Sequence, residues 1–337
     1  MTHEWFTLWT HYKERHKNER FVLASVVHLE GSSYRRPGVR MLISEQGERV
    51  GAVSGGCVEK EVQRQAEAVF ASQKPKMMQY DGRYRLGCEG ILYLLLEPFD
   101  VDEDHFEALD QSFNHRKSFQ LQSYYSLDMN AEKGLGTIWS EEGNSWPLSS
   151  EVTTGGLCFK QELSPRKRLL IFGGEHDAVV ISAMAAAQGY EVGVVTDPKE
   201  GKKTDDFPAA HHHEEWSAGQ EVKQMHWPSD QQTNILVMSH NFARDLAFLG
   251  ALSECPFAYL GILGPAHRRE KLVEGLFDHF PSAPLEFPDR WNAPAGLDLG
   301  AENAAEIGLS ILSEILLLER GHRGERLKHK KGKIHGS

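Results

Sequence analysis

Short apolar runs separated by glycine-containing turns dominate the first hundred residues of the chain. Runs of this length, bounded by turn residues, predict β-strands, and we expect them over 21–29, 39–44, 49–53 and 91–96. Apolar residues also recur at helical spacing, which predicts helices over 1–17 and 57–71. This part of the chain is therefore expected to form a mixed α+β domain.

Residues 98–165 have a less regular pattern. An acidic stretch over 101–113 has helical spacing, and short polar strands interrupted by glycines follow it. We interpret this region as a β-rich extension of the first domain, with a linker at 164–167. The N-terminal domain is thus expected to span 1–165.

Strands and helices alternate in the second half of the chain. Strands are predicted over 168–172, 190–196, 234–239 and 257–263, and helices over 177–188, 242–253, 266–280 and 304–319. Such alternation predicts a Rossmann-like, doubly wound parallel sheet over 166–320. The fold class is therefore α/β, with an N-terminal α+β domain before the parallel-sheet domain. The broad apolar face of the last helix predicts a homodimer.

Composition narrows the function classes. The net charge of the 337 residues is −11, although 321–337 is a basic segment that we expect to be a flexible tail. The acidic body argues against a nucleic-acid partner. The four cysteines lie far apart, which excludes a disulfide framework and a zinc knuckle. No signal peptide and no apolar run long enough to span a membrane is recognised, so a cytoplasmic protein is expected.

A glycine turn between a predicted strand and helix carries the main candidate chemistry. Residues 54–59 read Ser-Gly-Gly-Cys-Val-Glu, with Ser54 as the expected helix N-cap and Glu59 in the first turn. Backbone N–H groups in such a turn bind anions, and the same field lowers the pKa of a cysteine. Cys57 is thus either a reactive or metal-binding thiolate or a small buried apolar residue.

Three arginines, Arg35, Arg36 and Arg40, lie close in sequence to this turn. Guanidinium groups bind phosphate bidentately, which predicts an anionic ligand between the arginine loop and Gly55-Gly56. The alternative is that the arginines are solvated. Cys88 lies in a second glycine turn and either approaches Cys57 or is only a spacer.

The Gly173-Gly174 turn of the second domain matches a dinucleotide fingerprint incompletely, because Glu175 takes the place of its middle glycine. Asp197 lies at the distance expected for a ribose contact. His176 in the same turn and His240 at a strand end are candidate ligand-facing groups. The pattern predicts the fold strongly and NAD(P) binding weakly. Histidines 211–213 could bind a metal, but a solvated loop is favoured.

The chain contains several short sequence blocks, at 31–38, 54–59 and 86–88 in the first half and at 171–173, 237–240, 259–264, 293–300 and 306–307 in the second half. Together these blocks resemble those of the XdhC/CoxI accessory proteins. Tyr34, Glu89 and Glu175 depart from the family pattern. The resemblance implies a molybdenum cofactor chaperone, which holds the molybdopterin during sulfuration and inserts it into a xanthine-dehydrogenase-type hydroxylase. In the family the cysteine of the second block, here Cys57, is tied to cofactor binding.

We therefore predict an insertion factor rather than a turnover enzyme. Cys57 is the candidate catalytic and metal-binding residue. The candidate cofactor-binding residues are Arg35, Arg36, Arg40, Ser54, Gly55, Gly56, Cys57, Glu59, Cys88, Gly173, His176, Asp197 and His240. Expected partners are the large subunit of a molybdenum hydroxylase, a cysteine desulfurase and a second copy of the chain, with no nucleic acid or membrane. The alternatives are an NAD(P)-dependent oxidoreductase and a structural subunit of a hydroxylase complex.

Overall fold

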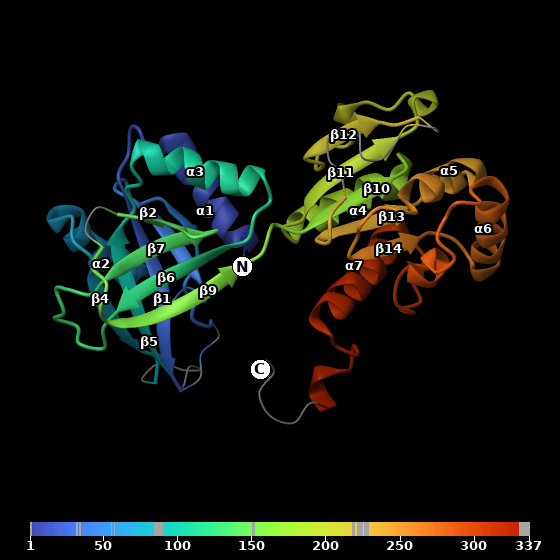
Figure 1. Ribbon diagram of the computed structural model, residues 1–337. Coiled ribbons are helices and arrows are strands. Elements are labelled where there is room, and N and C mark those ends of the chain that lie inside the picture. The colour runs from blue at the N-terminus through green and yellow to red at the C-terminus, as the bar shows by residue number, and fades with distance from the viewer. Residues whose placement is uncertain are drawn as a thin grey trace. The chain divides into compact units, whose positions relative to one another are not determined.

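The computed structural model describes residues 2–31, 33, 35–54, 56, 58–83, 90–149, 152–217, 220, 225 and 229–329. The chain divides into two compact units, Met1–Arg166 and Lys167–Ser337 (Figure 1). The described residues contain no helix that is both long and apolar enough to cross a membrane.

The first unit is built on a five-stranded antiparallel sheet with the order β3-β2-β1-β5-β4. Its strands are β1 (Phe21–Glu30), β2 (Arg40–Ser44), β3 (Arg49–Gly51), β4 (Lys76–Asp81) and β5 (Ile91–Pro98). Both faces of the central strands are buried, because side chains alternate between two separate apolar cores. This explains why β1 and β5 read as continuous apolar runs.

Different elements cover the two faces of this sheet. Helix α2 (Glu59–Ser72) packs on one face through Val62, Ala66 and Val69. Helices α1 (Thr2–Arg15) and α3 (Glu103–Asn114) pack on the other face together with a second sheet. That sheet has the order β8-β7-β6-β9, from β6 (Phe119–Tyr125), β7 (Gly136–Glu141), β8 (Asn144–Pro147) and β9 (Leu157–Leu163). Strands from residues 119–163 thus form a second antiparallel sheet in the first unit.

The second unit is a six-stranded parallel sheet with the order β12-β11-β10-β13-β14-β15. Its strands are β10 (Arg168–Phe172), β11 (Glu191–Thr196), β12 (His212–Glu215), β13 (Thr233–Val237), β14 (Tyr259–Ile262) and β15 (Trp291–Asn292). Helices α4 (His176–Ala187) and α7 (Ala304–Arg320) share one core, and α5 (Phe242–Leu252) and α6 (Ala266–His279) share the other. The predicted Rossmann-like fold is confirmed. The connections reverse direction between β10 and β13, which makes this position the topological switch point.

Four short 3₁₀ helices complete the described elements: η1 (Pro198–Glu200), η2 (Thr204–Asp206), η4 (Phe287–Arg290) and η5 (Leu327–His329). The last of these lies within the segment predicted as a flexible tail, and residues 330–337 lie outside the described part of the chain.

Three edge strands, β4, β12 and the two-residue β15, were not predicted from the sequence. Strand β4 has a polar composition, but Met77 and Met78 are buried on opposite sides of the sheet. Strand β12 contains two of the three consecutive histidines, so the prediction of a solvated loop there was wrong. Its residues pair with β11, and His213 shares a hydrogen bond of 2.8 Å with Thr196. Edge strands are harder to recognise from the sequence because natural edge strands are often short and carry charged or polar residues.

Candidate functional site

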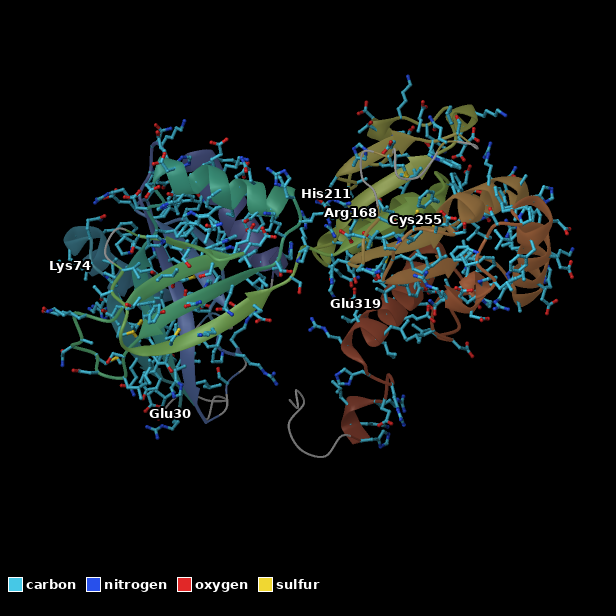
Figure 2. All side chains as sticks on the ribbon, viewed as in Figure 1. Glu30, Lys74, Arg168, His211, Cys255 and Glu319 are labelled. Atoms are coloured by element: carbon cyan, nitrogen blue, oxygen red, sulfur yellow. The ribbon has the colours of Figure 1, made fainter. Side chains whose placement is uncertain are left out.

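Three loops leave the same end of the five-stranded sheet. Since neighbouring strands are antiparallel, β1, β3 and β4 end where β2 and β5 begin. Glu30 at the end of β1 and Asp81 at the end of β4 both pair with Ile91, and Glu30 lies at this end of the sheet in Figure 2. The segments that follow β1, β3 and β4 therefore leave the sheet in the same direction, although the last residue of β3, Gly51, is level with Ala24 and not with Glu30. They are the segments that carry the three N-terminal sequence motifs.

Several predicted site residues in these segments lie outside the described part of the chain. They are Gly55, Cys57 and Cys88. The residues around Cys57 are described on both sides, and they define how the chain enters and leaves this position.

Ser54 organises the turn that contains Cys57. Its Oγ accepts hydrogen bonds from the N–H groups of Gly56 (3.1 Å) and Val58 (3.3 Å). The same hydroxyl donates to Glu59 Oε2 at 2.7 Å, and the Ser54 N–H donates to Glu59 Oε1 at 2.8 Å. Ser54 was predicted to be the N-cap of the helix, but α2 begins at Glu59 with Val58 in the N-cap position. Ser54 instead closes the turn before the helix.

Glu59 is the anion of this turn. Burial would raise its pKa, but hydrogen bonds from Ser54 and from the N–H groups of Gly56 and Glu59 outweigh burial and lower the pKa below its ordinary value. The residue is only 7% exposed, and its carboxylate lies where we expected an external anion. Glu59 therefore shapes the turn from inside. A Cβ placed on Gly56 would have no described atom within 4 Å.

Arg40 does not belong to this turn. Its guanidinium contacts Gln161 Oε1 and donates to the Gly38 carbonyl at 2.9 Å, and it lies 5.5 Å from the ring of Trp5. These partners are on the α1 side of the sheet, whereas the next residue, Met41, packs into the core beneath α2. Burial lowers the pKa of Arg40 to about 10, against the opposing effect of Glu97. The prediction that Arg40 joins the glycine turn is corrected, because adjacent strand residues face opposite sides.

Arg35 and Arg36 remain in the loop after β1. Arg35 Nη1 lies 3.4 Å from Glu4 Oε1, and Arg36 is exposed. The start of this loop is supported by aromatic residues that the sequence did not single out. Tyr93 donates a hydrogen bond of 3.0 Å to Glu30, and its ring lies 5.4 Å from that of His28. The signal was present in the sequence as two polar residues, His28 and Glu30, at the end of an apolar strand.

The second predicted site lies at the switch point of the parallel sheet. Gly173 has φ +135°, and a Cβ there would lie 2.6 Å from the Met238 carbonyl oxygen and 2.8 Å from Ser239 Cα. Only glycine permits this approach of the loops after β10 and β13. A Cβ on Gly174 would lie 2.8 Å from Thr196 and 3.0 Å from Glu200 Oε2.

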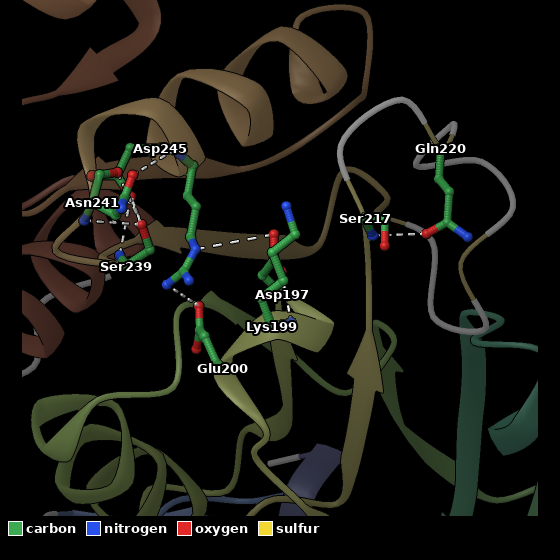
Figure 3. Close-up of polar contacts among 9 residues, drawn as sticks. Asp197, Lys199, Glu200, Ser217, Gln220, Ser239, Asn241 and Asp245 are labelled. Atoms are coloured by element: carbon green, nitrogen blue, oxygen red, sulfur yellow. Dashed lines mark hydrogen bonds and ion pairs between the residues drawn. The ribbon is translucent and has the colours of Figure 1, made fainter.

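Carboxylates surround the Gly173-Gly174 turn. Arg244 Nη1 donates to Glu200 at 3.0 Å, and its Nε lies 4.0 Å from Asp197 (Figure 3). Asp197 accepts a hydrogen bond of 2.8 Å from the Lys199 N–H. The Glu200 side chain is 3% exposed, and burial raises its pKa despite Arg244. With Glu175 at the helix N-cap as well, these residues do not fit a dinucleotide pyrophosphate, which would meet like charge at this turn.

The two histidines of the switch point lie on neighbouring loops. His176 is exposed at the start of α4, and His240 has φ +55° after β13. His240 Nε2 lies 3.6 Å from Asp177 Oδ2. The topology thus brings Gly173, Asp197 and His240 to one edge. Within the described residues, no three His, Cys, Asp or Glu side chains are arranged to hold a metal ion.

Comparisons with known proteins agree with both halves of this description. The family described as XdhC and CoxI matches residues 14–81, and the XdhC Rossmann domain matches residues 169–315. The chain is 28% identical over 327 residues to a probable xanthine dehydrogenase subunit of Bacillus subtilis, covering 88% of this chain and 93% of that protein.

Two further relatives extend over most of the chain. It is 26% identical to the molybdenum cofactor insertion chaperone PaoD of Escherichia coli, over 87% of this chain and 82% of that protein. The chain is also similar to a crystal structure described as a xanthine dehydrogenase from Bacillus halodurans, with a TM-score of 0.78 and 25% sequence identity. The matched region covers 96% of this chain and 97% of the chain in that crystal structure. The two family matches occur in order and together span more than half of the sequence, so the chain belongs to the XdhC/CoxI family.

Proposed function

We propose that this protein binds the molybdenum cofactor, holds it during sulfuration and inserts it into a xanthine-dehydrogenase-type hydroxylase. The observation that carries the proposal is that β1, β3 and β4, the strands before the three sequence motifs, all run toward the same end of the first sheet. The names of the relatives support an accessory role in the maturation of such enzymes. In this proposal the protein acts as an insertion factor rather than a turnover enzyme.

The described residues suggest a division of roles at the site. Ser54 and Glu59 hold the residues on either side of Cys57, which precedes α2 in the sequence. The Cys57 thiolate is a soft ligand suited to a transition metal. Arg35 and Arg36 supply the positive charge for a phosphate. When bound, the cofactor supplies the molybdenum centre whose terminal ligand is exchanged.

Two features of the turn limit which groups can fit. Because Glu59 already accepts hydrogen bonds from Ser54, Gly56 and its own N–H, an external phosphate at this turn would meet like charge. Because Arg40 faces the other side of the sheet, the arginine loop must provide the phosphate contacts. Both conditions are met if the loop with Arg35 and Arg36 binds the phosphate of the pterin and the sulfur on the metal lies near Cys57.

The proposal is tested by cofactor retention. The protein is co-expressed with the molybdopterin pathway and purified, and bound pterin is measured by fluorescence after oxidation. We expect Cys57→Ala to lose most of the bound cofactor. Cys158→Ala is the matched control, since Cys158 is a half-buried thiol on β9 whose pKa is raised by burial. Equal pterin content in wild type and Cys57→Ala would falsify the proposed role of Cys57.

The partners can be tested in the same preparation. We expect the cofactor-loaded protein to bind the large subunit of a molybdenum hydroxylase transiently and to release it after transfer. A cysteine desulfurase is the expected source of sulfur, and a homodimer is expected from the last helix. Stable co-purification with the large subunit in the absence of bound pterin would favour a structural role instead. Micromolar binding of NADH would favour an oxidoreductase.

A further inference from the structure

A cavity of about 430 Å³ lies where α5 and α6 begin, in the second unit. It is lined by Phe242, Pro265, His267, Arg268 and Lys271. Phe242 starts the helix after β13, and Pro265 precedes the helix after β14. The cavity is therefore at the carboxyl edge of the parallel sheet, where open α/β sheets bind ligands. Its volume is within the usual range of small-molecule sites.

The charged residues that line this cavity are basic. Arg268 is held by an ion pair of 2.7 Å with Asp245, whose side chain is only 1% exposed. The other oxygen of Asp245 accepts hydrogen bonds from the N–H and the hydroxyl of Ser239. Lys271 is exposed and makes no hydrogen bond or ion pair with any residue that the structure describes. One fixed guanidinium and one adaptable ammonium group thus face the same space.

The cavity also has a flat apolar wall. The Phe242 side chain is 39% exposed, and its ring centre lies 6.0 Å from the Arg268 guanidinium. Gly264 has φ +129°, and a Cβ there would lie 2.5 Å from Arg268 Cδ. Glycine at this position therefore lets the arginine fold back beside the aromatic ring. Helix α6 has no acidic residue in its first turn, so no carboxylate of that turn offsets the positive end of the helix dipole.

We propose that this cavity binds a phosphorylated planar heterocycle, with its phosphate at Lys271 and Arg268 and its ring against Phe242. A phosphate matches the fork of a guanidinium and the point charge of an ammonium group. An exposed aromatic side chain stacks on flat rings. A nucleotide and a phosphorylated pterin share this chemistry. The site is independent of Cys57 and the arginine loop, which belong to the other unit.

The probes are AMP, adenosine, inorganic phosphate and a phosphorylated pterin, each titrated into the full-length protein by calorimetry. We expect AMP to bind about tenfold more tightly than adenosine or phosphate, and more weakly as salt is raised. Lys271→Gln and Phe242→Ala should each weaken AMP binding about five- to tenfold. Lys203→Gln, an exposed lysine that does not line the cavity, should leave the affinity unchanged.

Three results would overturn the site: equal affinities for AMP and adenosine, wild-type affinity in Lys271→Gln, or no detectable binding of either phosphorylated probe. The tighter of AMP and the phosphorylated pterin identifies the class of natural ligand, and either preference supports the site. A negative result leaves the proposed cofactor role standing, because pterin retention through Cys57 is measured separately.

Discussion

In the first unit, the turn between β3 and α2 is closed by two of its own side chains, Ser54 and Glu59. In the second unit, the turn between β10 and α4 is shaped by neighbouring loops, which approach Gly173 and Gly174 directly. Both turns lead from a strand into a helix and look alike in sequence. The first has one hydrogen-bonded carboxylate, that of Glu59, and no described atom within 4 Å of a Cβ placed on Gly56. The second has several carboxylates and a single compensating ion-pair partner for Glu200 in the described residues, Arg244.

The difference shows that a glycine turn before a helix does not by itself make an anion site. What decides is whether the N–H groups and the positive field are already used by carboxylates of the protein. At the first turn Glu59 uses part of the field. At the second turn Glu175, Asp197 and Glu200 give the position the wrong charge for a pyrophosphate.

The largest expected effect distinguishes the turn at Gly173, which neighbouring loops approach closely, from the turn at Gly56. Gly173→Ala should destabilise the second unit by about 3–5 kcal/mol, since it combines an unfavourable φ with a backbone clash against Met238. Gly56→Ala, with φ +116° but no described neighbour within 4 Å, should cost only about 1–2 kcal/mol in the first unit. Urea unfolding followed by hydrogen exchange assigns each loss to its unit. Equal losses of unfolding free energy in Gly173→Ala and Gly56→Ala would contradict the difference between the two turns.

A second test compares the effect of Arg40 on stability with the effect of Arg35 and Arg36 on cofactor binding. Arg40→Met should destabilise the first unit by about 2–4 kcal/mol, because Gln161 and the Gly38 carbonyl lose a buried charged partner. The double change Arg35→Gln/Arg36→Gln should leave the free energy of unfolding nearly unchanged and lower pterin retention about tenfold. Unfolding and bound pterin are measured on the same samples. If the Arg40→Met variant is well folded but loses bound pterin, Arg40 contributes to cofactor binding.

A third test concerns the carboxylate that closes the first turn. Glu59→Ala should cost about 2 kcal/mol, because the N–H and hydroxyl of Ser54 lose their acceptor in a largely buried place. Bound pterin should fall as well, since the turn around Cys57 loses its support. Glu61→Ala is the control, because Glu61 is on the same helix but bonds to Arg64 and Gln65 at the surface. If both variants behave alike, the turn does not depend on Glu59.

The smallest expected effect is in the pH dependence, which should have opposite signs in the two turns. The pKa of Glu59 is lowered by folding, so its stabilisation is present at neutral pH and is lost as pH falls through the folded pKa. The pKa of Glu200 is raised, so its contribution is full at low pH and is lost as pH rises through the folded pKa.

Urea midpoints at acidic and neutral pH check these signs. We expect Glu59→Gln to reduce the loss of stability that the first unit shows as pH falls. We expect Glu200→Gln to reduce the loss that the second unit shows as pH rises, and each change should be about 1 kcal/mol. The same sign in both variants would contradict the assigned environments.

Much of the fold could be predicted from periodicity alone. Strand β10 was predicted at its exact bounds and helix α5 to within one residue, because buried parallel strands and amphipathic helices have strong local patterns. Strands β4 and β12 were missed because edge strands are often short and carry charged or polar residues. The site was predicted less completely, since Arg40 and Ser54 have roles that depend on which face and which neighbour each side chain meets.

The amino-acid sequence by itself determined the two-part α/β architecture, the family blocks and the position of Cys57 between a strand and a helix, because these follow from local spacing. Only the tertiary structure decided that Arg40 faces the opposite side of its sheet, that Glu59 accepts the hydrogen bonds of the turn, and that carboxylates meet at Gly174. The physical reason is that charge and hydrogen-bond satisfaction depend on partners distant in the chain, which a one-dimensional pattern does not contain.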